Sequence, residues 1–200
     1  MFVIIEGMDN TGKTSLHEHI LEIYKSRALN KDIKIITTHS SAYTDPISYM
    51  LYLLHLDHNT DKVLILCDRV SMMGEYVYGP VLRSTNAFDS ITPDKSSTML
   101  FEDLWNIFIQ SIKPNNLASY PKLIFIYCRP TDYVQSTKEE MIGVVNNQYP
   151  LLARYDAHAL KLQALFHSHR PFKDIEFLVY DYQQDPLYDN IMDLLSQTMR

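Results

Sequence analysis

The chain has 200 residues, 46% of them hydrophobic, and no Pro-, Gly- or Ser-rich linker divides it, so the composition predicts one domain over residues 1–200. Its formal net charge of −6 argues against a large sequence-independent surface for duplex DNA, but it leaves room for a local basic groove. Two cysteines at the ends of apolar runs predict free thiols of a reducing compartment, and the lack of a secretion signal or a membrane-spanning apolar run predicts a soluble cytoplasmic protein.

The first predicted element is a short apolar strand over residues 2–5, which runs into a loop with the spacing G-x-x-x-x-G-K-[ST] from Gly7 to Thr14. Apolar residues then recur at helical spacing over residues 16–28. The two glycines let successive backbone N–H groups point inward around a diphosphate, beside the positive N-terminus of the helix. Lys13 is expected to reach the β- and γ-phosphates of ATP, and the Thr14 hydroxyl to ligate Mg²⁺. The residues predicted to hold the phosphate chain are Gly7, Asn10, Thr11, Gly12, Lys13, Thr14 and Ser15.

Strands and helices alternate through the rest of the chain. Apolar strands are expected at residues 33–38, 62–67, 123–128 and 175–180, the first of them buried on both faces of a sheet. Helices are expected at residues 46–56, 70–80, 101–112, 148–167 and 186–199, and the second of these should end near Gly79-Pro80. The polar stretch at about 130–145 is a candidate lid over the phosphates. This order predicts an α/β three-layer sandwich with a five-stranded parallel central sheet and helices on both faces.

Charged residues follow two of the predicted strands, at the sheet edge where open α/β proteins place their ligands. Asp68 and Arg69 come directly after residues 62–67, and a carboxylate at this place suits Mg²⁺ coordination or activation of an acceptor. Glu75 lies on the following helix and is expected to face the same cleft. Arg129 comes directly after residues 123–128.

The order of these motifs resembles the thymidylate kinase family of P-loop nucleotide and nucleoside kinases. The resemblance is most specific at Glu6-Gly7-x-Asp9, at Gly12-Lys13-Thr14 and at Asp68-Arg69. It implies a P-loop kinase fold that uses ATP and Mg²⁺. It also implies that Asp9 lies near the transferred phosphoryl group, that Arg69 binds or orients the acceptor, and that Asp68 helps to position the metal or the attacking oxygen.

Two departures from the family pattern concern the acceptor. Where thymidylate kinases carry a Thr-Arg-Glu-Pro turn, this chain has Thr38-His39-Ser40-Ser41, and Lys138 is the one strong basic residue of the candidate lid. The run Gly74-Glu-Tyr-Val-Tyr-Gly79 is similar to a subgroup from bacteriophages that hypermodify thymine and phosphorylate 5-hydroxymethyluracil within DNA. The residues expected to bind the acceptor are His39, Ser40, Arg69, Arg129 and Lys138.

The leading hypothesis from the sequence is an ATP-dependent kinase acting on a thymidine-like pyrimidine deoxynucleotide. Its most specific form phosphorylates 5-hydroxymethyl-deoxyuridine in phage DNA, with Lys13, Asp9, Asp68, Arg69 and Glu75 as catalytic residues. The alternative is a kinase for a free deoxynucleoside monophosphate such as thymidylate. A second alternative is a nucleotide-binding regulatory module that transfers no phosphate. The sequence leaves open whether the protein forms a homodimer.

Overall fold

The structure is a computed structural model, which describes residues 1–28, 34–40, 44–56, 63–84, 99–112, 123–134, 149–170, 174–186 and 188–197. The candidate lid lies mostly outside the described residues. The strands are β1 (Phe2–Glu6), β2 (Lys34–His39), β3 (Val63–Asp68), β4 (Leu123–Cys128) and β5 (Ile175–Tyr180). The helices are α1 (Lys13–Ala28), α2 (Pro46–His55), α3 (Ser71–Ser84), α4 (Phe101–Ser111), α6 (Tyr149–His169) and α7 (Asp189–Gln197).

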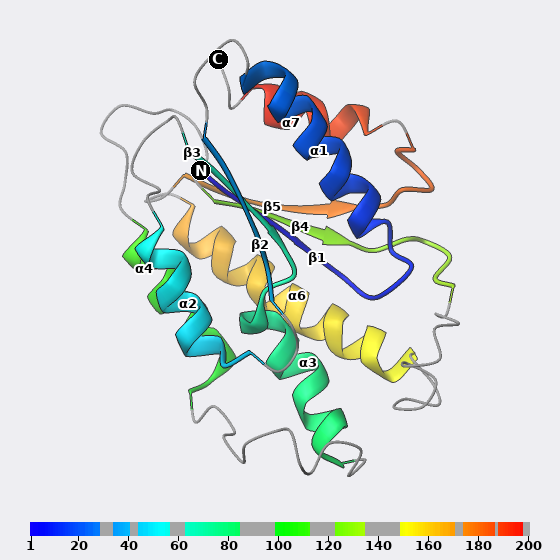
Figure 1. The fold of residues 1–200 in the computed structure, drawn as a ribbon. Coiled ribbons are helices and arrows are strands. Elements are labelled where there is room, and N and C mark those ends of the chain that lie inside the picture. Colours follow the sequence, from blue (N-terminus) through cyan, green and yellow to red (C-terminus); the bar gives the residue numbers. More distant parts are fainter. Residues whose placement is uncertain are drawn as a thin grey trace.

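The five strands form one parallel sheet in the order β2-β3-β1-β4-β5 (Figure 1). The first strand of the chain is therefore the central strand, with Phe2 paired to Ile65 on one side and to Leu123 on the other. Parallel strands need crossover connections, and helices supply them here. The predicted α/β sandwich with a five-stranded parallel sheet is confirmed.

Helices cover both faces of the sheet, so the molecule has three layers (Figure 1). On one face, α1 and α7 pack against the odd-numbered side chains of β1, including Val3 and Ile5. On the other face, α2, α3, α4 and α6 pack against Phe2 and Ile4. Alternate side chains of a strand point to opposite faces, and this explains why an unbroken apolar run forms β1. Within the described residues, no helix is both long and apolar enough to cross a membrane.

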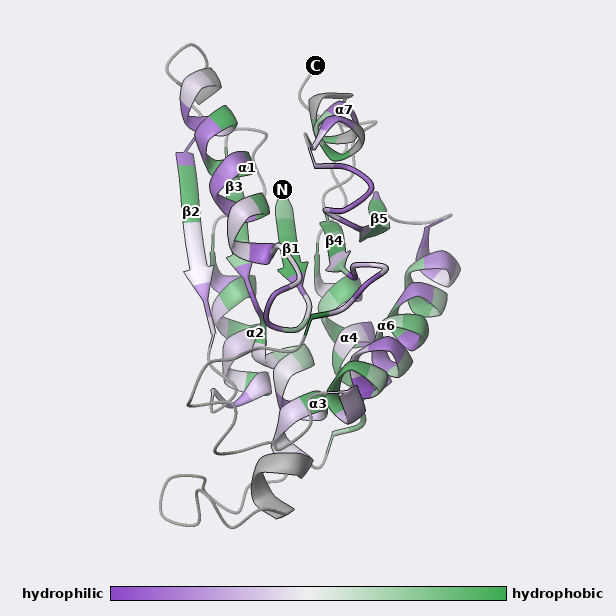
Figure 2. Cartoon of the chain, turned by 90° about the vertical axis from the view of Figure 1, so that its right-hand side faces the viewer, coloured by the Kyte–Doolittle hydropathy of each residue, from purple (hydrophilic) through white to green (hydrophobic). Residues whose placement is uncertain are grey.

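The prediction that the second strand is buried on both faces is wrong. β2 lies at the edge of the sheet, and most of its side chains are exposed or half-buried. Figure 2 shows β2 largely pale or purple, whereas β1 is green. Ile35 and Ile36 each pack against a core cluster, whereas Lys34 and Thr37 are exposed. β-Branched residues suit an edge strand as well as a central one, so composition alone does not separate the two positions.

The prediction that the helix after β3 ends near Gly79-Pro80 is also wrong, because α3 continues to Ser84 with Pro80 inside it. Proline has no N–H, so the carbonyl of Tyr76 loses its helical partner at position 80. Arg154 of α6 replaces that partner: its Nη2 donates to Tyr76 O at 2.9 Å, and its Nε donates to Val77 O at 3.1 Å. A guanidinium from a neighbouring helix thus holds the broken turn together.

We expect Arg154→Met to lower the free energy of unfolding by about 1–3 kcal/mol, because it removes the two hydrogen bonds that Arg154 donates to backbone carbonyls of α3 while keeping an apolar stem. Urea denaturation followed by circular dichroism measures the change. Lys161→Met is the matched control on the same helix, because Lys161 forms an exposed ion pair with Glu102 at 2.8 Å. Such pairs contribute at most about 1 kcal/mol. Equal losses in the two variants would contradict the role given to Arg154.

Candidate active site

The loop between β1 and α1 follows a path that glycine makes possible. Gly7 has a φ of 151°, and a Cβ there would stand 2.5 Å from the backbone oxygen of Cys128. Gly12 has a φ of 80°, and a Cβ there would stand 3.1 Å from the ring of Tyr182. After this turn α1 begins at Lys13, with its positive N-terminal end beside the loop. Both glycines of the G-x-x-x-x-G-K-[ST] spacing thus stand where the backbone of the loop requires a residue without a Cβ.

Lys13 lies inside this loop, with only 6% of its surface exposed. Its Nζ donates to Met8 O at 2.5 Å, and the Thr11 hydroxyl donates to the same carbonyl at 2.6 Å. Burial, followed by the positive charge of Arg69, lowers the pKa of Lys13 to about 8, although the carboxylate of Asp9 opposes the shift. The ammonium is therefore held in a low-dielectric site, where it interacts strongly with any anion that enters.

The pKa of Lys13 predicts how anion affinity depends on pH. An anion binds the protonated amine, so the affinity for ADP without Mg²⁺ should fall roughly tenfold between about pH 7 and pH 9. The sign follows from the folded pKa lying below its ordinary value, which lets the amine lose its proton near pH 8. Isothermal titration calorimetry at each pH measures the change. Lys13→Arg stays charged over this range and should remove most of the dependence. A flat wild-type profile would contradict the prediction.

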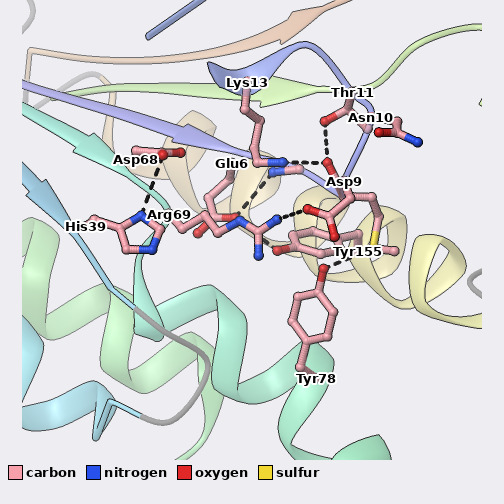
Figure 3. Close-up of polar contacts among 12 residues, drawn as sticks. Glu6, Asp9, Asn10, Thr11, Lys13, His39, Asp68, Arg69, Tyr78 and Tyr155 are labelled. Carbon is pink, nitrogen blue, oxygen red and sulfur yellow. Dashed lines mark hydrogen bonds and ion pairs between the residues drawn. The ribbon is translucent and has the colours of Figure 1, made fainter. Parts of the chain in front are cut away.

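An ion pair between Asp9 and Arg69 connects this loop to the end of β3. Arg69 follows β3, and its Nη2 forms an ion pair with Asp9 Oδ1 (Figure 3). The side chain of Asp9 is 11% exposed and that of Arg69 is 27% exposed. Both charges therefore lie at the border between the core and a cleft, where solvent screens them only in part.

Asp68 and His39 end the neighbouring strands β3 and β2, at paired positions of the register. His39 Nδ1 lies 3.5 Å from Asp68 Oδ2 (Figure 3). The other oxygen, Asp68 Oδ1, is buried and has no hydrogen-bond partner among the described residues. A buried carboxylate oxygen normally has a partner, so this one is suited to a ligand or an ion.

These groups surround one cleft of about 470 Å³ at the carboxyl edge of the sheet, which we call the first cleft. Its volume lies within the range of small-molecule sites, roughly 300–1,000 Å³. Every described residue that lines it was singled out from the sequence: Asp9, Asn10, Thr11, Gly12, Lys13, Thr14, Ser15, His39, Asp68 and Arg69. The sheet topology thus brings the phosphate loop and the residues after β3 together.

Other residues singled out from the sequence lie elsewhere. Ser40 is buried and lines a cavity of only about 10 Å³ behind Arg69. Glu75 lines neither the first cleft nor that cavity, and its carboxylate lies close to Gly79 on the same helix. Lys138 lies outside the described residues.

Arg129 lines a different cleft of about 620 Å³, which we call the second cleft, beside the ends of β4 and β5. Its guanidinium donates two hydrogen bonds to the carboxylate of Asp156 of α6, from Nε at 2.9 Å and from Nη2 at 3.2 Å. The remaining Nη1 donates to Pro130 O at 2.8 Å. Tyr182 lies in the chain between Asp181 and Gln184, which line the second cleft, and its ring packs against Gly12 of the phosphate loop. The second cleft is therefore next to the loop, on the side away from β3.

Glu6 belongs to the Glu6-Gly7-x-Asp9 motif, which by itself indicates no role for this residue. The structure buries this carboxylate completely at the end of β1. Tyr155 of α6 donates its hydroxyl to Glu6 Oε2 at 3.1 Å, and Val70 donates its N–H to Oε1 at 2.6 Å. The available signal was an acidic residue continuing an apolar strand, because buried carboxylates are rare unless they have partners.

The sheet order and the loop after β1 define a P-loop α/β fold. No protein-family model and no curated protein sequence matches the chain. Among solved structures, it is similar to thymidylate kinase from Ehrlichia chaffeensis, with 15% identity, a TM-score of 0.44 and coverage of 98% of each chain. It is also similar to thymidylate kinase from Candida albicans, with 14% identity, a TM-score of 0.33, and coverage of 96% of this chain and 92% of that one. At such low identity the likeness is one of fold.

Proposed function

We propose that the chain is an ATP-dependent phosphotransferase with a pyrimidine deoxynucleotide as its acceptor. The observation that carries this proposal is the first cleft, where Lys13 and the phosphate loop meet Asp68 and Arg69. Phosphoryl transfer needs positioning and electrostatic stabilisation more than covalent chemistry from the protein. The phosphate loop, a buried ammonium and a guanidinium meet that need. The similarity in fold to thymidylate kinases is consistent with this proposal but does not carry it.

The two clefts suit the two ends of the donor. The triphosphate would lie on the loop in the first cleft, and the purine base would lie in the second cleft beside Arg129. Because three nitrogens of Arg129 already donate to Asp156 and Pro130, the guanidinium offers its flat face and not its N–H groups. A planar cation of this kind stacks well on an aromatic ring.

Thr14 and Asp68 fit a magnesium ion that accompanies ATP. Both line the first cleft, and the buried Oδ1 of Asp68 has no hydrogen-bond partner among the described residues. Mg²⁺ prefers hard oxygen ligands and is held by one or two protein groups together with substrate phosphates. This agrees with the finding that no cluster of three His, Cys, Asp or Glu side chains occurs within the described parts of the chain. When bound, the ion neutralises phosphate charge.

The charges of the first cleft favour a neutral acceptor group. Among the described residues, its lining includes two basic side chains besides His39, those of Lys13 and Arg69, and the phosphates of the donor would engage both. A donor triphosphate and a dianionic acceptor would together need more cationic partners. A hydroxyl acceptor carries no charge, and His39 and Asp68 can orient it by hydrogen bonds. We therefore place the 5-hydroxymethyl group of deoxyuridine in DNA first, and a free deoxynucleoside monophosphate second.

Transfer of label from γ-labelled ATP tests the proposal. The acceptors are DNA with 5-hydroxymethyluracil, the same DNA with thymine, free thymidine and thymidine monophosphate. We expect label on the hydroxymethylated DNA alone, in a product whose new phosphate is on the base. The cost of taking a base out of a duplex is about a few kcal/mol, so single-stranded DNA should react faster than duplex.

The other outcomes are equally distinct. Rapid labelling of thymidine monophosphate, with none of DNA, would decide for the monophosphate kinase. ATP binding without transfer to any acceptor would favour the regulatory module. Asp68→Asn separates the metal role from fold effects, because it should abolish transfer and magnesium-dependent ATP affinity while leaving magnesium-free ADP affinity unchanged. Glu75, Ser40 and Lys138 stay predictions that the same assay can test by alanine substitution.

A further inference from the structure

Glu6 is a buried acidic residue with no place in the chemistry proposed above. It is fully buried where β1 ends, one residue before the phosphate loop. A carboxylate removed from water is costly unless donors surround it. Three donors do so, since the N–H groups of Val70 and Gly7 lie 2.6 and 3.3 Å from its oxygens and the Tyr155 hydroxyl lies 3.1 Å away.

The shortest of these bonds reaches the residue that follows Arg69. Arg69 has a φ of 61°, in the left-handed region that residues with a Cβ seldom adopt. Such a conformation persists only where surrounding contacts hold it. Two contacts with β1 do so, because Arg69 N–H donates to Ile5 O at 3.0 Å and the next N–H, of Val70, donates to Glu6.

The left-handed turn of the chain directs the Arg69 side chain back over the sheet edge. Its guanidinium then meets Asp9 and lines the first cleft (Figure 3). With a helical φ, the backbone would leave β3 in another direction, and the side chain would not reach the same point. The position of the Arg69 guanidinium therefore depends on the buried hydrogen bond that the Val70 N–H donates to Glu6.

We propose that Glu6 is a positioning residue, which fixes Arg69 for contact with phosphate by holding the Val70 N–H. It touches no substrate itself. The reach of its side chain matters more than its charge, because the decisive contact is with a backbone N–H at a fixed place. This inference deepens the proposed function, and its second readout rests on that function.

Two substitutions separate reach from charge. Glu6→Gln keeps the length and an oxygen for Val70 but removes the charge. Glu6→Asp keeps the charge but is one methylene shorter, so it cannot reach Val70. The matched control is Glu102→Asp, which shortens a surface glutamate paired with Lys161. Thermal unfolding of each variant shows whether it is folded.

The first readout needs no ligand. In the wild type the Val70 amide should exchange slowly with deuterium, and the Arg69 side chain should give one sharp nuclear magnetic resonance signal. Glu6→Asp should speed the exchange at Val70 at least about tenfold and shift the Arg69 signal, and Glu6→Gln should change both much less. Equal effects in the two folded variants, or no effect in either, would overturn the inference whatever the protein binds.

The second readout is the affinity for inorganic tripolyphosphate by isothermal titration calorimetry. Arg69→Ala should weaken binding on the order of tenfold to a hundredfold, and Glu6→Asp should do so nearly as much. The double variant should be no weaker than Arg69→Ala alone, because the two residues act as one unit. A double variant that loses affinity by the product of the two single losses would overturn the inference. If the first readout succeeds and Arg69→Ala leaves the affinity unchanged, the proposed phosphate site is wrong and Glu6 only shapes the loop.

Discussion

Replacing Lys13 with alanine should lower the rate of phosphoryl transfer by about a hundred- to a thousandfold, the usual cost of losing one preorganised electrostatic contact. The ammonium is buried inside the phosphate loop, where a low dielectric strengthens its attraction to the charge that develops in the transition state. Initial rates with γ-labelled ATP measure the loss. The free energy of unfolding should change little, because burial already disfavours the charged form of Lys13, as its lowered pKa shows.

Lys161→Ala serves as the control for this prediction, because it removes an equally long cation from an exposed position that lines neither cleft. Its rate should equal that of the wild type. A Lys13→Ala protein that is folded and transfers phosphate at the wild-type rate would remove the loop from the reaction.

The second large effect is expected for Gly7→Ala. An added methyl group would lie 2.5 Å from the backbone oxygen of Cys128, which cannot move without disturbing β4. The left-handed φ adds its own strain for any residue with a Cβ. We expect a loss of at least about 2 kcal/mol in the free energy of unfolding and no measurable ADP binding. Urea denaturation and calorimetry measure the two effects.

Gly79→Ala is the matched glycine control. A methyl group there would also meet an atom at short distance, 2.7 Å, but that atom is the carboxylate end of Glu75, a side chain that can rotate away. Position 79 is inside α3, where alanine favours the helix by about 1 kcal/mol over glycine, and this gain offsets the crowding of the new Cβ by the ring of Pro80. The variant should be as stable as the wild type or slightly more so. A loss equal to that of Gly7→Ala would show that simple crowding, and not the loop conformation, governs both positions.

The parts of the first cleft that are local in sequence were predictable. The phosphate loop is a run of adjacent residues, and the rule that ligands gather at the carboxyl edge of parallel strands places Asp68 and Arg69 beside it. Glu6 escaped this reasoning because its partners are remote, Val70 being 64 positions away and Tyr155 149 positions away. No periodicity in the chain encodes such pairs.

Arg129 and β2 illustrate what strand order adds. The edge rule places Arg129 correctly at the end of β4, yet only the position of β4 between β1 and β5 assigns it to the second cleft. Likewise, the exposure of β2 follows from its place at the edge of the sheet, which its own residues do not reveal. Pro80 is a third case, because a helix breaker is tolerated where Arg154, from a distant helix, replaces the missing bond.

The central position of β1 also governs how the chain can fold as it leaves the ribosome. β1 is synthesised before both of its neighbours, β3 and β4, which follow much later in the sequence. Until residues 123–128 emerge, one edge of β1 has no strand to pair with, and an unpaired apolar edge invites pairing with other chains. Pairings between residues so far apart in the chain also make folding slow. A nascent chain that stalls before β4 would therefore carry a complete phosphate-loop sequence on an aggregation-prone, unfinished sheet.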